Sequence, residues 1–166
     1  MGSHQNLYIV GVGNPEAGDD GFGPAVIARL RTMPLSATPQ LLDVGIDPLG
    51  ILPFMDKAQE MWIVDAVRMK APPGTIADFT PGEIAITSSL GHSLHGLGLD
   101  HALQLARLLY PKVVVRVFGA EPLHIKMGTG LSSEMTHALE AIVQVICERL
   151  RQKEEYSRGS ENLDSG

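Results

Sequence analysis

Two adjacent carboxylates, Asp19 and Asp20, follow the first apolar segment of the chain and stand just before an amphipathic helix. A helix N-terminus favours negative charge, so one of the two can be explained as a cap. The second needs another explanation, because neighbouring carboxylates repel each other unless a cation or a shared proton offsets the repulsion. The pair therefore indicates a site that binds a cation or moves a proton.

A third carboxylate and a histidine-containing loop extend this candidate site. Asp65 directly follows an apolar segment, and His92 and His95 lie in a glycine- and serine-rich loop over 87–98. One aspartate of the first turn, Asp65 and one imidazole would supply oxygen and nitrogen ligands that suit a divalent transition ion, with positions left open for substrate or water. The sequence thus favours a metal-dependent site.

A purely structural interpretation of the same residues stays open at this point. Asp20 can cap the helix while Asp19 faces water, and Asp65 can simply close a turn after its strand. His95, in a glycine-rich loop, can be solvated or bonded to backbone. The other histidines of the chain body, His101, His124 and His137, show no partner pattern and are interpreted as structural.

Other motifs are incomplete. Gly11 and Gly13 follow an apolar segment as in a dinucleotide fingerprint, but Glu16 stands where the third glycine belongs and would repel a pyrophosphate. Neither GxxxxGK[ST] nor GxSxG occurs. Cys147 is the only cysteine, which excludes an intrachain disulfide and a thiolate zinc cluster. A nucleotide-binding module is therefore the weaker alternative.

The elements that must position these residues alternate between strands and helices. Strands are expected over 7–12, 40–44, 61–64, 75–79 and 113–118, and helices over 22–30, 49–55, 99–109 and from 132 or 133 to about 150. This order predicts a three-layer α/β/α fold with a five-stranded, mostly parallel twisted sheet and one antiparallel strand, the fourth, as a hairpin-like return. The acidic turn, Asp65 and the histidine loop all fall at the carboxyl ends of strands, where such folds bind ligands.

Composition limits the class of protein. The chain has 166 residues, 44% of them hydrophobic, a net charge of −6 and a pI near 5.4. We expect a remnant of an expression tag over 1–4, one α/β catalytic domain over 5–150 and a polar, frayed tail over 151–166. The acidic balance argues against nucleic acid and anionic membranes as partners. No apolar run approaches the roughly 18 residues of a membrane span, and the N-terminus lacks the basic, then apolar, pattern of a secretory signal, so we expect neither. A cytoplasmic monomer is the expectation.

The motifs taken together resemble those of one known family. GVGNPEAGDDGFGP, IVDA with a nearby PG, SLHGLGL, FGAEP and GLS follow one another over 7–149, as in the [NiFe]-hydrogenase maturation endopeptidases. The resemblance implies a cytoplasmic hydrolase that removes the C-terminal extension of a hydrogenase large-subunit precursor after nickel insertion. A non-catalytic nickel-binding chaperone of hydrogenase assembly is the alternative that the same ligands would serve.

The resemblance also implies roles for individual residues. Three residues would recognise nickel and take part in catalysis, namely Asp20, Asp65 and His95. Asp19 would support them, and Gly13 and Asn14 would shape the turn. The nickel would be supplied by the substrate, with no permanently bound cofactor.

Two expectations concern the reaction itself. No serine or cysteine stands in a recognisable nucleophile setting, so we expect water to attack a metal-polarised carbonyl with an aspartate as base. Ile46 follows Gly45 where family members carry a small or hydroxyl residue. This departure bears on which hydrogenase is served and leaves the three ligands unchanged.

Overall fold

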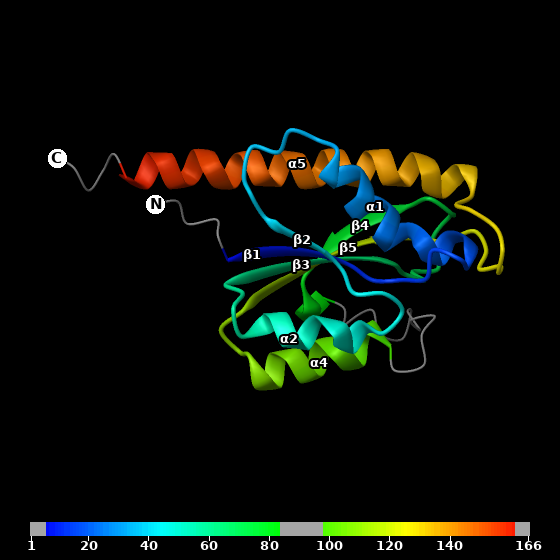
Figure 1. Cartoon of the computed structure of the whole chain (residues 1–166), viewed down its shortest axis with the longest axis horizontal. Coiled ribbons are helices and arrows are strands. Elements are labelled where there is room, and N and C mark those ends of the chain that lie inside the picture. The colour runs from blue at the N-terminus through cyan, green and yellow to red at the C-terminus, as the bar shows by residue number, and fades with distance from the viewer. Residues whose placement is uncertain (1–5, 84–97, 162–166) are drawn as a thin grey trace.

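The computed structural model describes residues 6–83 and 98–161 (Figure 1). Its centre is a five-stranded sheet in the order β2-β1-β3-β5-β4. The strands are β1 (Leu7–Gly11), β2 (Gln40–Asp43), β3 (Glu60–Ala66), β4 (Ile76–Phe79) and β5 (Val114–Ala120). Only β4 is antiparallel to its neighbour among these strands, so the predicted three-layer fold with a mostly parallel sheet is confirmed.

Helices cover both faces of the sheet. The helices α1 (Phe22–Arg31) and α5 (Ser133–Glu161) lie on one face, and α2 (Leu52–Met55) and α4 (Leu99–Leu109) lie on the other (Figure 1). Two short 3-10 turns, η1 (Gly18–Gly21) and η2 (Pro48–Ile51), lead into α1 and α2.

The central strands are apolar on both faces because both faces are covered. In β3, Trp62 and Val64 pack with α1 and α5, whereas Met61 and Ile63 pack with α2 and α4. All four side chains are at most 1% exposed. A continuous apolar run rather than an alternating one is typical of a parallel strand buried in this way.

Two strands differ from the sequence-based expectation. β3 continues through Asp65 to Ala66, because Asp65 pairs with Gly119 in the register of β5. β4 pairs with β5 and not with β3, so the expected hairpin-like return is wrong. β3 already has β1 and β5 as neighbours, and β4 therefore forms the edge beyond β5.

The last helix is longer than expected. α5 runs through Arg151 to Glu161, a stretch in which the sequence predicts a polar tail rather than a helix. Charged pairs on the helix surface favour the extension, among them Arg158 with Glu154 at spacing i,i+4. Lys153 also binds Glu60 of β3, which ties the extension to the sheet. None of the helices in the described ranges is long and apolar enough to span a membrane.

Candidate active site at the carboxyl edge of the sheet

Glycines bring the acidic turn against the carboxyl ends of two strands. A Cβ atom at Gly23 would lie 2.3 Å from the carbonyl oxygen of Val12 and 2.5 Å from that of Val64. Only glycine allows α1 to begin so close to β1 and β3. The η1 turn, which carries Asp20, therefore packs at the end of β3 that carries Asp65.

Asp20 is buried and held by the turn that precedes it. Asp20 is only 2% exposed, and its Oδ2 atom accepts a hydrogen bond of 3.0 Å from the Asn14 amide. The Asn14 side chain in turn accepts a bond of 3.0 Å from the amide of Glu16. Gly13 has a φ of 142°, and a Cβ there would lie 2.0 Å from the Asp20 carbonyl oxygen. Gly13 and Asn14 thus shape the backbone around the carboxylate.

Asp19 is fully buried, which contradicts the interpretation that it faces water. Its carboxylate accepts hydrogen bonds from the amides of Ser132 at 2.6 Å, Leu123 at 2.8 Å and His124 at 3.2 Å. The Ser132 hydroxyl adds a fourth at 2.9 Å. Burial raises the pKa of the Asp19 carboxyl, but these hydrogen bonds outweigh burial and leave the pKa below its ordinary value.

Neither aspartate caps the helix that follows. Within the described part of the chain, no side chain makes a capping hydrogen bond at the start of α1, whose N-cap is Gly21. Asp19 instead lies at the start of α5, where Ser132 accepts a bond of 3.3 Å from the Met135 amide. Asp19 therefore ties the acidic turn to the β5–α5 loop. Because no described side chain caps α1, the interpretation of Asp20 as a helix cap is wrong.

Asp65 occupies a rigid position. It is 1% exposed and lies inside β3, opposite Gly119 of β5. Beyond it the two strands stay joined, because the Val67 amide donates to the Ala120 carbonyl at 2.9 Å. A carboxylate removed from water at the end of a strand is costly and is typical of functional sites. Asp20 and Asp65 thus place two buried carboxylates at one edge of the sheet.

Glu121 is a further buried carboxylate, for which the sequence motifs predict no role. It follows β5, is 5% exposed, and accepts hydrogen bonds from the amides of Met69 and of Ala71, the latter at 3.4 Å. Arg68 approaches it to 4.0 Å. Glu121 thus fixes the loop that leaves β3 just after Asp65. The signal was present in FGAEP, where an acid directly follows an apolar strand as Asp65 does.

His95, the histidine predicted as a ligand, lies outside the described residues, as does His92 of the same loop. Within the described ranges, no group of three His, Cys, Asp or Glu side chains gathers closely enough to hold a metal ion. His101 is an exposed helix residue 3.4 Å from Asp100. His124 contributes its backbone to the site, because its carbonyl accepts from the Asp19 amide at 3.3 Å.

Cys147 and Ile46 also have defined places. Cys147 packs partly buried against the core between the sheet and α5, and burial raises the pKa of its thiol. Ile46 is 55% exposed beside Gly45, whose carbonyl accepts from the Gly13 amide at 2.9 Å. An apolar side chain is therefore exposed close to the turn that carries Asp20.

Comparisons with known proteins give a family match and several relatives over most of the chain. Residues 24–149 match the family model of the hydrogenase maturation proteases. The chain is 30% identical over 157 residues to the hydrogenase expression/formation protein HupD of Thiocapsa roseopersicina, covering 92% of this chain and 71% of the relative. It is 29% identical over 125 residues to HupD of Rhodobacter capsulatus, covering 74% of this chain but only 60% of that relative's length.

Among solved structures, the hydrogenase maturating endopeptidase HybD from E. coli has the same fold. The two structures superpose with a TM-score of 0.76 at 24% identity, covering 90% of this chain and 94% of HybD.

Proposed function

This chain belongs to the hydrogenase maturation protease family, and on that premise we propose that it is an endopeptidase acting on a hydrogenase large-subunit precursor. Cleavage of one peptide bond releases the C-terminal extension of the precursor after nickel has been inserted. The observation that carries this proposal is the family match over residues 24–149, which includes Asp65 and Glu121. Asp20 precedes the matched range, so its assignment rests on the sequence motif and on its buried position.

We propose that Asp20 and Asp65, together with His95, recognise nickel that the precursor already holds. Both carboxylates are at most 2% exposed, and they lie on adjacent elements at the carboxyl edge of the sheet. Carboxylate oxygens and an imidazole nitrogen form only part of a coordination sphere, and the ligands of the precursor would supply the rest. A nickel-free precursor would lack this interaction and bind more weakly.

For the cleavage step we propose attack by water. An aspartate takes the proton of the water, the hydroxyl adds to the scissile carbonyl carbon, and the C–N bond breaks as the amine accepts a proton. Asn14 restrains one oxygen of Asp20, so the carboxylate is oriented before substrate arrives. A covalent acyl-enzyme trapped on any residue would contradict this step.

Mass spectrometry distinguishes this function from that of a nickel-binding chaperone. Purified protein is incubated with nickel-loaded large-subunit precursor, and the mass of the precursor is followed over time. The protease shortens the precursor by a C-terminal peptide. An unchanged mass combined with tight binding would favour the chaperone.

A further inference from the structure

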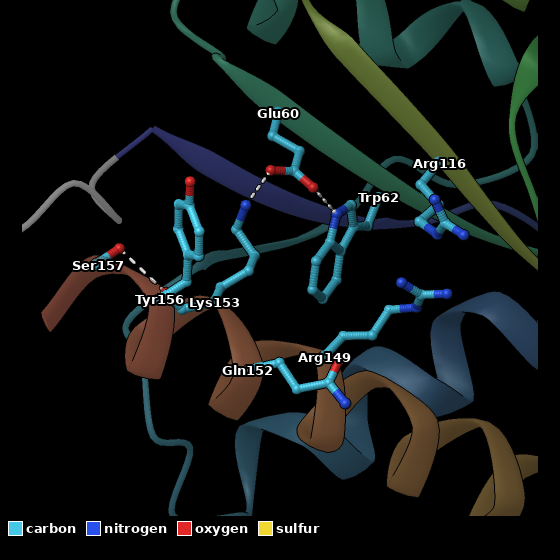
Figure 2. A pocket seen from close by; sticks show the side chains of 8 residues that line it. All are labelled: Glu60, Trp62, Arg116, Arg149, Gln152, Lys153, Tyr156 and Ser157. Atoms are coloured by element: carbon cyan, nitrogen blue, oxygen red, sulfur yellow. Dashed lines mark hydrogen bonds and ion pairs between the residues drawn. The ribbon is translucent and has the colours of Figure 1, made fainter. Parts of the chain in front are cut away.

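A cavity of about 370 Å³ lies at the opposite end of the sheet from the acidic turn. It opens between the C-terminal half of α5 and the strands β3 and β5 (Figure 2). Glu60, the first residue of β3, lines it, whereas Asp65 is near the other end of the same strand. The cavity is therefore separate from the candidate active site.

One side of the cavity carries a charge pair that is internally balanced. Glu60 accepts a hydrogen bond of 2.6 Å from the indole nitrogen of Trp62 and also binds the ammonium group of Lys153. Trp62 is 1% exposed and lies between this pair and two arginines (Figure 2). The indole thus forms the floor of the cavity and separates its two charged halves.

The other half contains more positive than negative charge. Arg116 of β5 and Arg149 of α5 both bind the same carboxylate, Asp78 of β4. Arg116 donates to Asp78 through Nε, and Arg149 donates through Nε and Nη2. Hydrogen bonds from Thr80, and to a smaller extent the charge of Arg116, lower the pKa of the Glu83 carboxyl.

The two guanidinium groups have N–H donors that remain available to a ligand. Their side chains are 28% and 34% exposed, so they are half-buried at the cavity wall. Within the described part of the chain, the Nη atoms of Arg116 and the Nη1 atom of Arg149 make no hydrogen bond to protein. Both guanidinium groups line the cavity, whereas the carboxylates of Asp78 and Glu83 are not among its lining residues, so this wall is positively charged although the chain as a whole carries −6.

We propose that this cavity binds a small ligand through an oxyanion, a carboxylate or a phosphate, held between Arg116 and Arg149. Guanidinium groups present forked donors that match either group, and partial burial strengthens such bonds. The volume has room for the rest of a small organic ligand next to Trp62 and the exposed Tyr156. This inference does not depend on the proposed proteolysis.

Trp62 makes the proposal directly measurable, because it is the only tryptophan in the sequence. The indole N–H resonance of the full chain is followed by NMR while orthophosphate or succinate is added at constant ionic strength. We expect a saturable shift of this resonance and of the arginine side-chain N–H resonances that line the cavity. A response to phosphate alone indicates a phosphate ester, and a response to succinate alone indicates a carboxylate ligand.

A pair of variants on the same helix tests the assignment. Arg149→Gln removes one of the two positive charges that line this wall but leaves Asp78 paired with Arg116. We expect binding about tenfold weaker, as for the loss of one charge-assisted hydrogen bond. Arg151→Gln is the control, because Arg151 is 60% exposed and binds Glu148 outside the cavity. The affinity of the Arg151→Gln variant for phosphate or succinate should stay within about twofold of wild type.

Three outcomes would overturn the proposal. The first is no saturable shift of Trp62 with either probe. The second is equal weakening by both variants, which indicates general charge attraction to the helix. The third is that the NMR resonances of the wild-type chain that shift on adding a probe belong to residues away from Trp62, Arg116 and Arg149. This result does not depend on whether the Arg149 variant folds.

Discussion

At the residue scale, the two adjacent aspartates have different surroundings despite identical chemistry. Asp19 accepts four hydrogen bonds from the β5–α5 loop, whereas Asp20 is bound by the Asn14 amide of its own turn and lies next to the carboxyl end of β3. The first therefore acts as a structural tie, and the second is presented to the site. Both belong to one short turn, so the position of Asp20 depends on the bonds of its neighbour.

Replacing Asp19 tests this structural tie through pH. The folded-state pKa of Asp19 lies below the ordinary 3.8, so its stabilising effect is present above that value and is lost as pH falls through the folded-state pKa. Asp19→Asn places an amide donor against backbone donors, and we expect it to lower the free energy of unfolding at pH 7 by about 1–3 kcal/mol. Urea unfolding at several pH values measures the difference.

The difference between wild type and Asp19→Asn should narrow below pH 4, because the wild-type carboxyl then takes up a proton. Asp56→Asn is a matched control, since Asp56 is exposed at the end of α2 and should change stability by less than about 0.5 kcal/mol. A gap between wild type and Asp19→Asn that stays constant down to pH 2 would show that Asp19 is not the titrating group.

The site aspartates should affect processing without unfolding the protein. We expect Asp20→Asn and Asp65→Asn to slow removal of the C-terminal peptide by about 100-fold or more, because each loses a charged ligand or base. The Asp56→Asn variant again serves as the control. Processing rates from a gel-shift assay measure the effect, and a wild-type rate in either variant would remove that residue from the proposed site.

His95 needs its own test because it lies outside the described residues. The motif SLHGLGL implies that His95→Ala abolishes processing, while His92→Ala, three residues earlier in the same loop, has a mild effect. The same processing assay applies to both variants. Equal loss in the two would indicate that the loop as a whole matters and that His95 has no special role.

At the element scale, close contact between α1 and the sheet determines where the site forms. Gly23→Ala would force a Cβ against the carbonyl oxygens of Val12 and Val64, at separations of 2.3 and 2.5 Å. The helix must then move away, and we expect a loss of about 1–3 kcal/mol in the free energy of unfolding. Processing should fall with it, because η1 carries Asp20 and precedes α1 directly.

Gly159→Ala provides the comparison for this substitution. A Cβ at Gly159 of α5 meets nothing within 4 Å, so the change should be neutral or stabilise the helix by up to about 1 kcal/mol. Thermal unfolding of the two variants side by side measures both effects. Equal behaviour of Gly23→Ala and Gly159→Ala would mean that α1 does not need its close approach to β1 and β3.

Much of the element order could be predicted from the sequence, since buried strands and amphipathic helices have local patterns. The end of β3 could not, because Asp65 reads as a turn residue until Gly119 of β5 is known to lie opposite. The extension of α5 was missed for a similar reason. Its polar residues gain support from distant Glu60, which no local pattern contains.

The candidate site shows the same division between local and distant information. The types and order of Asp20 and Asp65 could be read from motifs, but the burial of Asp19 depends on a loop more than 100 residues away in sequence. Glu121 was overlooked because its partners, the amides after β3, are likewise distant. Hydrogen bonds between loops that meet only in the fold leave little trace in a single sequence.

At the scale of the whole molecule, the two ends of the parallel sheet have different chemistry. The carboxyl end gathers buried carboxylates. The amino end holds the arginine-lined cavity over Trp62 (Figure 2). Rigid strands separate the two, so a variant at one end should leave the other intact. Arg149→Gln should therefore process the precursor at the wild-type rate.

The most direct test of the proposed function compares nickel-loaded and nickel-free precursor in parallel reactions with the wild-type chain. We predict that mass spectrometry detects loss of the C-terminal peptide from the nickel-loaded precursor only, and that Asp65→Asn leaves both forms intact. Cleavage of the nickel-free precursor at the same rate would contradict recognition of nickel through Asp20, Asp65 and His95.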